Sequence, residues 1–179
     1  MKKIAVFGKP ANGKSTLSHR LSLATGIKKY SIDSILYESS GKEIERSSYE
    51  TMHSEIISSP EWIIEGFGPL NSLDSFYQRI AAADTLVYID LSYPVTYWLV
   101  VKRLLKSIYK KPEGWPKNSS VLDGTVKSFK TLRLCPLFWN DKFLHSIESR
   151  KDEKNVFVIR SLRELKRFAN TVYNENESL

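Results

Sequence analysis

The chain has 179 residues, of which 41% are hydrophobic and 26% charged, which excludes a disordered chain and predicts one compact domain over residues 1–179. The single cysteine, Cys135, excludes a disulfide framework and favours the cytoplasm. The longest apolar tract, residues 86–101, is too interrupted to span a membrane, so no membrane partner is expected. The net charge of +7 falls wholly within residues 97–133, where nine basic residues face two acidic ones, so the partner of this segment should be an anion.

The first elements of the chain predict a phosphate-binding loop. Residues 4–7 form a short apolar run, typical of a buried parallel strand, and an i, i+4, i+7 apolar pattern over residues 17–24 predicts a helix. Between them, residues 8–16 read G-K-P-A-N-G-K-S-T and fit the P-loop pattern G-x-x-x-x-G-K-[ST]. A glycine loop that binds nothing is the alternative, but strand, loop, Lys-Ser pair and helix coincide where the motif requires them.

Each part of this loop has a chemical reason to bind ATP. Gly8 and Gly13 allow the backbone to turn its N–H groups toward one phosphate, and the following helix adds its positive end. Lys14 is expected to place a charge on the β- and γ-phosphates, and the Ser15 hydroxyl to join the Mg²⁺ shell. The predicted ATP-binding residues are Gly8, Pro10, Ala11, Asn12, Gly13, Lys14, Ser15 and Thr16.

The rest of the chain alternates strands and helices. Further strands are predicted at 27–32, 62–64, 85–89 and 156–159. Further helices are predicted at 49–58, 73–80, 94 to about 110, and 162–172, with a helical region to about 150 broken near Pro136. Residues 111–124 hold two prolines and two glycines and read as a loop. The pattern predicts the α/β class, with a five-stranded parallel sheet and helices on both faces.

Three carboxylates are predicted to lie at the ligand-binding edge of this sheet. Asp33, Glu65 and Asp90 each follow or end a predicted strand, and ligands bind beyond the carboxyl ends of parallel strands. Ser15 with Asp33 or Glu65 is predicted to hold Mg²⁺, and Asp33 is also predicted to contact the acceptor. A helix cap or a solvated loop acid is the alternative for each carboxylate.

Phosphoryl transfer also needs cations that stabilise the transferred group. Besides Lys14, Arg103 and Lys106 are predicted to act in this way from a lid at about residues 103–124, although a solvated basic face is the alternative. Arg79 precedes the fourth strand and could clamp a substrate anion or complement the helix dipole. The acceptor site is expected at about residues 32–60.

The chain resembles nucleoside-monophosphate-kinase-like P-loop proteins and, within the adenylate-kinase-related proteins, is most similar to the DNA topology modulation group. The resemblance rests on G-K-P-A-N-G-K-S-T-L, Y-S-I-D-S-I, W-I-I-E-G and R-I-A-A-A-D-T-L-V-Y-I-D-L-S-Y-P. It implies strand order 2-3-1-4-5 and a lid over the active site. Adenylate kinases carry an arginine shortly after the acid of the third strand, where this chain has Gly66-Phe67-Gly68-Pro69, so AMP is a doubtful acceptor.

The sequence therefore predicts an ATP-binding phosphotransferase that uses Mg·ATP and a small acceptor, with a nucleotide favoured. A kinase of a small metabolite, such as a shikimate- or gluconate-like acceptor, is one alternative. A nucleotide-binding regulatory protein that acts on nucleic acid through residues 97–133 is another, although no recognised nucleic-acid motif supports it. The protein is expected to be a monomer or a dimer.

Overall fold

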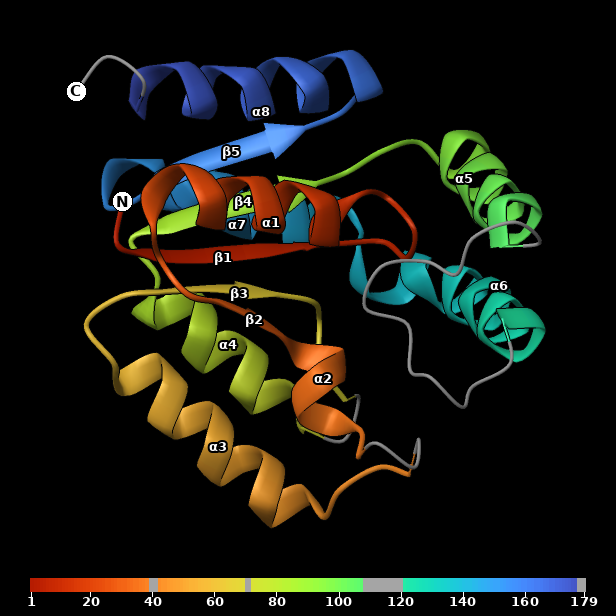
Figure 1. The fold of residues 1–179 in the computed structure, drawn as a ribbon, viewed down its shortest axis with the longest axis horizontal. Helices are drawn as coiled ribbons and strands as arrows, with labels where there is room; N and C mark the ends of the chain where they lie inside the picture. Colours follow the sequence, from red (N-terminus) through yellow and green to blue (C-terminus); the bar gives the residue numbers. More distant parts are fainter. Residues whose placement is uncertain (39–41, 70–71, 108–120, 177–179) are drawn as a thin grey trace.

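A five-stranded parallel sheet in the order β2-β3-β1-β4-β5 lies at the centre of the computed structural model, which describes residues 1–38, 42–69, 72–107 and 121–176 (Figure 1). The strands are β1 (Lys3–Gly8), β2 (Lys29–Ser31), β3 (Trp62–Glu65), β4 (Thr85–Ile89) and β5 (Asn155–Ile159). The fold class and the strand order predicted from the sequence are confirmed.

Helices cover both faces of the sheet, because successive strand side chains point to opposite faces. On the Val6 face pack α1 (Lys14–Thr25) and α8 (Leu162–Asn176), which bury the inner positions of β1, β3 and β4. On the Phe7 face pack α4 (Leu73–Ala82) and α7 (Asp141–Glu148), followed by the short helix η2 (Ser149–Asp152). The helix α3 (Arg46–Ser58) packs against α4 on this same side (Figure 1).

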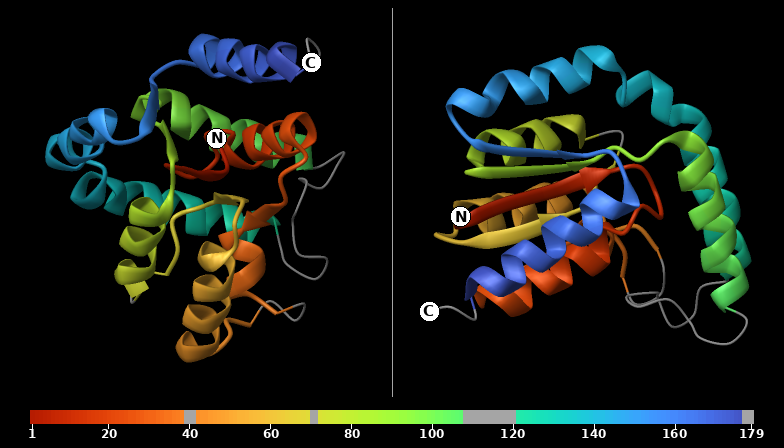
Figure 2. Two further views of the ribbon diagram at one scale, coloured as in Figure 1. Left: turned by 90° about the vertical axis from the view of Figure 1, so that its left-hand side faces the viewer. Right: turned by 90° about the horizontal axis from the view of Figure 1, so that it is seen from above.

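Two helices, α5 (Tyr93–Ser107) and α6 (Val121–Phe138), pack against each other beside the sheet and are called the α5–α6 hairpin below (Figure 2). Val100, Leu132 and Cys135 form its buried core, and the P-loop residue Ala11 packs against that core. The helix α6 ends two residues after Pro136, close to the predicted break. No helix among the described residues is both long enough and apolar enough to cross a membrane.

Two predicted boundaries are wrong. The strand expected over residues 27–32 ends at Ser31, and Ile32–Leu36 form the short helix α2, so Asp33 lies in a helical first turn. The fully buried Ile32 packs so closely under Gly66 that a Cβ atom there would lie 2.9 Å from the Ile32 Cβ, a tertiary contact that outweighs local propensity. The helix α6 begins inside the loop expected at 111–124. Most of that loop, and of the lid expected at 103–124, lies outside the described residues.

The buried imidazole of His53 on α3 should make stability depend on pH. Its side chain is 1% exposed, and neither ring nitrogen has a hydrogen-bond partner among the residues that the structure describes. Burial, and then the charge of Arg79, lower its pKa from 6.5 to about 4. Because the pKa of His53 is lower in the folded state than in the unfolded state, the free energy of unfolding is highest above pH 6.5. It decreases as the pH falls toward 4.

Between neutral pH and about pH 4, the free energy of unfolding of the His53→Phe variant should therefore decrease by about 3 kcal/mol less than that of the native protein. Urea unfolding at neutral pH and at about pH 4 measures the difference. A variant that loses as much stability as the native protein over this interval would contradict the assignment.

Candidate active site

The parallel register places the P-loop beside Glu65. Val6 of β1 pairs with Glu65 of β3, so the two strands end at the same edge of the sheet. Ser15, in the first turn of α1, donates a hydrogen bond from Oγ to Glu65 Oε1 at 3.0 Å. Glu65 is only 5% exposed, while Ser15 is exposed. Two of the three predicted Mg²⁺ ligands are thus in direct contact.

Left-handed backbone conformations give the loop its shape. The φ angle is 140° at Gly8, 59° at Ala11 and 89° at Gly13. A Cβ atom at Gly8 would lie 2.3 Å from the carbonyl oxygen of Ile89, so only glycine fits. The buried Asn12 donates from Nδ2 to that same carbonyl at 2.7 Å, which holds the loop against the end of β4.

A second tether joins the loop to the segment after β4. The Lys9 side chain is 3% exposed, forms an ion pair with Asp90 and donates from Nζ to the carbonyl oxygen of Leu91 at 3.0 Å. Asp90, a candidate acid, therefore neutralises a lysine that supports the loop. Sequence reasoning missed Lys9, because it fills an unspecified position of the motif and its partner lies 81 residues away.

Lys14 lies over the loop in a position to receive a phosphate. Its Nζ donates to the carbonyl oxygen of Lys9 at 2.7 Å and to Asn12 Oδ1 at 3.2 Å. Burial lowers the pKa of Lys14, and the negative charges of Glu65 and Asp33 oppose that shift. A bound phosphate would add a much closer anion and favour the charged ammonium.

Asp33 interacts electrostatically with the other charged groups of the site. Asp33 retains exposed surface, yet burial of its carboxyl group, and then the charge of Glu65, raise its pKa above the ordinary 3.8. The charges of Lys14, Lys127 and Arg103 oppose this shift. The carboxylate therefore lies within electrostatic reach of both the P-loop and the α5–α6 hairpin.

The hairpin contributes one predicted cation and one that was missed. Arg103 donates from Nη2 to Ser128 Oγ at 2.7 Å, and burial lowers its pKa while Asp33 opposes that shift. Lys127 of α6 is hydrogen-bonded to the Tyr37 hydroxyl. The sequence placed Lys127 in the basic segment and within a predicted helical region, but assigned it no role in the site. The predicted partner of Arg103, Lys106, is exposed and lies outside this set.

Arg79 is fully buried beneath the loop that follows Glu65. Its Nη2 donates to the carbonyl oxygens of Gly66 at 3.0 Å and Phe67 at 2.9 Å. Burial lowers its pKa to about 10, an effect that the charges of Tyr49 and Glu65 oppose. A guanidinium held in this way fits the support of the loop better than a clamp on a substrate anion.

The substitution Arg79→Met should lower the free energy of unfolding by about 2 kcal/mol, because one buried and one partly buried carbonyl oxygen lose their donor. Urea unfolding measures the change, and Arg163→Met, on the exposed surface of α8, is the matched control. A stability loss no larger than that of the control would show that the guanidinium does not support the loop.

The oxygens beside the P-loop fit a magnesium ion that is shared with a nucleotide. Mg²⁺ prefers one or two carboxylates together with phosphate oxygens and water. Ser15 Oγ and Glu65 Oε1 are neighbours, and the repulsion between Glu65 and Asp33 would be relieved by a dication. Among the described residues, no group of three or more His, Cys, Asp or Glu side chains could hold a metal ion alone. When bound, Mg²⁺ would neutralise phosphate charge.

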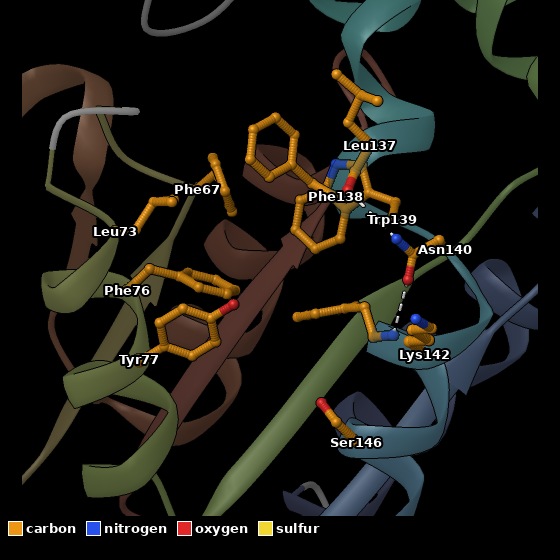
Figure 3. Close-up of a pocket in the computed structure, with 11 residues that line it drawn as sticks. Phe67, Leu73, Phe76, Tyr77, Leu137, Phe138, Trp139, Asn140, Lys142 and Ser146 are labelled. Atoms are coloured by element: carbon orange, nitrogen blue, oxygen red, sulfur yellow. Dashed lines mark hydrogen bonds between the residues drawn. The ribbon is translucent and has the colours of Figure 1, made fainter.

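A pocket of about 300 Å³ lies apart from these groups, between α4 and the junction of α6 with α7 (Figure 3). Phe67, Phe76 and Trp139 give it aromatic walls, and Asn140 and Lys142 lie along its other side. None of the predicted phosphate-binding residues lines it. The pocket is therefore an extension of the aromatic core.

No protein-family model and no curated protein matches the chain. Among solved structures, it is similar to a shikimate kinase from Bacteroides thetaiotaomicron, with a TM-score of 0.55 and 12% identity over 97% of each chain. A gluconokinase from Sinorhizobium meliloti 1021 has a TM-score of 0.47 and 15% identity over 97% of each chain. A sugar kinase from Janibacter sp. HTCC2649 has a TM-score of 0.47 and 12% identity over 99% of this chain and 93% of its own.

The narrower resemblance to the DNA topology modulation group gains no support, because the structure with the TM-score of 0.55 is named a shikimate kinase. At 12% identity, the likeness to the shikimate kinase bears on the fold. The strand order and the P-loop at the end of β1 agree with it. This chain has the fold of the P-loop kinases.

Proposed function

We propose that this protein is a kinase that transfers the γ-phosphoryl group of Mg·ATP to a hydroxyl group of a small metabolite. The observation that carries the proposal is the position of Asp33, within electrostatic reach of Lys14, Glu65, Arg103 and Lys127. A carboxylate beside a P-loop can orient an acceptor hydroxyl and take its proton, while the cations stabilise the charge on the transferred group.

The residues of the site divide this work among them. The P-loop backbone and Lys14 hold the phosphates of ATP, and Lys14 stabilises charge on the transferred phosphoryl group. Ser15 and Glu65, with Asp33 nearby, are the oxygen ligands available to Mg²⁺. Arg103 approaches from the hairpin and completes the positive surroundings of the phosphate.

The proposed acceptor class differs from the nucleotide that the sequence favoured. A nucleoside monophosphate brings a second phosphate, which needs cations beyond those that hold ATP. Gly68-Pro69 stand where adenylate kinases have an arginine, and Arg79 is bound to the carbonyl oxygens of Gly66 and Phe67. A small-metabolite acceptor is further supported by the fold likeness to a protein named a shikimate kinase.

A coupled assay of ADP release tests the proposal over shikimate, gluconate, simple sugars and nucleoside monophosphates, each with Mg·ATP. We expect one hydroxylated metabolite to stimulate turnover and the nucleoside monophosphates to have no effect. Stimulation by a nucleoside monophosphate would overturn the acceptor class. ATP binding by thermal shift without turnover on any acceptor would favour a nucleotide-binding regulatory protein instead.

A further inference from the structure

Exposed apolar side chains gather on the α5–α6 hairpin. More than half of the large apolar side chains that are exposed among the described residues belong to it: Trp98, Val101, Leu105, Leu122, Val126, Leu134 and Leu137. Leu122 is 64% exposed and Leu137 is 70% exposed, values more typical of lysine than of leucine. Such a gathering marks a surface that contacts something else.

Six of these side chains form one stripe on each helix, and Leu134 lies about 80° away from the α6 stripe. In α5, Trp98, Val101 and Leu105 follow the spacing i, i+3, i+7, which places them on a single helical face. In α6, Leu122 and Val126 lie one turn apart. Leu137 follows three turns later on that same face.

The two stripes lie on the same side of the hairpin. The rings of Tyr97 and Phe129 stack at 5.7 Å and mark the seam between the helices, which run in opposite directions (Figure 2). Around each helix axis, the stripe is rotated by roughly 50–70° from the seam residue, Tyr97 or Phe129, and the direction of rotation is the same in both helices. In antiparallel helices, equal rotations bring both stripes to one side. The hydrogen bond between Arg103 and Ser128 is displaced in the other sense, toward the proposed active site.

Basic side chains lie beside this apolar face, and Arg133 lies within the α6 stripe, one turn before Leu137. Lys102 and Lys106 of α5 and Lys130 and Arg133 of α6 are all exposed. The Lys102 Nζ lies 4.5 Å from the centroid of the Trp98 ring, so the cation borders the stripe directly. Residues 97–133 carry the whole net charge of the chain. Charge complementarity therefore calls for an anionic partner, and the apolar stripe calls for one that can bury leucine.

We propose that this face of the α5–α6 hairpin binds the surface of an anionic lipid bilayer. This peripheral contact needs no membrane-spanning helix, and it departs from the expectation, drawn from the sequence, of no membrane partner. Apolar side chains such as Trp98 and Leu105 enter the interface, and the bordering lysines reach the lipid phosphates. A nucleic acid supplies the charge but has no apolar interior for aliphatic side chains. The contact leaves the opposite side, with Arg103, open to substrates.

Co-sedimentation of the full chain with vesicles tests the proposal. We expect binding to vesicles of equal parts phosphatidylcholine and phosphatidylglycerol, weakening as salt is added, and little binding to pure phosphatidylcholine. The absence of binding to the anionic vesicles, with the protein folded and active in ADP release, would overturn it. Equal binding to both vesicles would overturn the role of charge.

Matched variants distinguish vesicle binding through this face from non-specific adsorption of the protein to vesicles. Leu105→Glu should weaken vesicle binding by about tenfold, while Leu23→Glu, on α1 and 66% exposed, should change it little. Lys130→Glu should weaken it more than Lys166→Glu, on the exposed surface of α8. Circular dichroism melting checks that each variant is folded. Equal effects within each pair would contradict the assignment of this face.

Two further measurements distinguish other occupants. Binding to a single-stranded oligonucleotide that is weakened by Lys130→Glu but not by Leu105→Glu, without vesicle binding, would assign the face to nucleic acid. A dimer in sedimentation velocity that Leu105→Glu dissociates, again without vesicle binding, would assign it to a second copy of the chain. Either result would overturn the proposal that this face binds a lipid bilayer.

Discussion

Replacing Lys14 with alanine should lower the rate of phosphoryl transfer by about a thousandfold. The lysine is the P-loop cation, and it already lies over the loop through hydrogen bonds to the carbonyl oxygen of Lys9 and to Asn12. Without it, the charge that develops on the transferred phosphoryl group would lose the cation that we propose stabilises it. ADP release with the best acceptor measures the loss.

The same substitution should leave the fold intact. Burial lowers the pKa of Lys14, so the native protein spends free energy to keep this charge in place. Urea unfolding of Lys14→Ala should therefore show stability close to that of the native protein, because relief of the buried charge offsets the loss of two hydrogen bonds. Lys28→Ala, at an exposed position, is the control for removing one lysine. Transfer that is unchanged in Lys14→Ala would overturn the proposed mechanism.

The parts of the site that the sequence could place are those whose geometry is local. Gly8 and Gly13 have positive φ angles because the contiguous P-loop motif encodes its own backbone path. Glu65 could be placed at the sheet edge from the order of strands alone, and the structure sets it against Ser15. Asp33 could be placed near that edge, but its helical turn depends on the packing of Ile32.

The parts that the sequence could not place depend on contacts between distant segments. Lys9 and Asp90 meet only when β1 and β4 pair, and no spacing rule connects them. Arg79 reaches the carbonyl oxygens after β3 because α4 packs over that loop, so the same residue type read as a possible substrate clamp. The side of the hairpin on which Lys127 lies depends on how α6 packs against its neighbours, and the first turn of this helix was expected to be a loop.

Replacing Asp33 with asparagine should lower kcat/KM for the acceptor by about a thousandfold, because the amide cannot take a proton. Asparagine keeps the size of the side chain and one acceptor oxygen, so binding of the metabolite should weaken less than kcat falls. Ser34→Ala is the matched control, since Ser34 is the exposed neighbour in the same turn.

The pH dependence gives this prediction its sharpest form. In the proposed mechanism Asp33 must be deprotonated to act as the base, so kcat/KM of the native protein should fall as the pH falls through the pKa of this group. Burial and Glu65 raise that pKa, so the fall should begin at a higher pH than an ordinary value of 3.8 implies. The residual activity of Asp33→Asn should lack this fall. A variant that keeps the native pH profile, or that changes only KM, would show that Asp33 positions the acceptor without taking its proton.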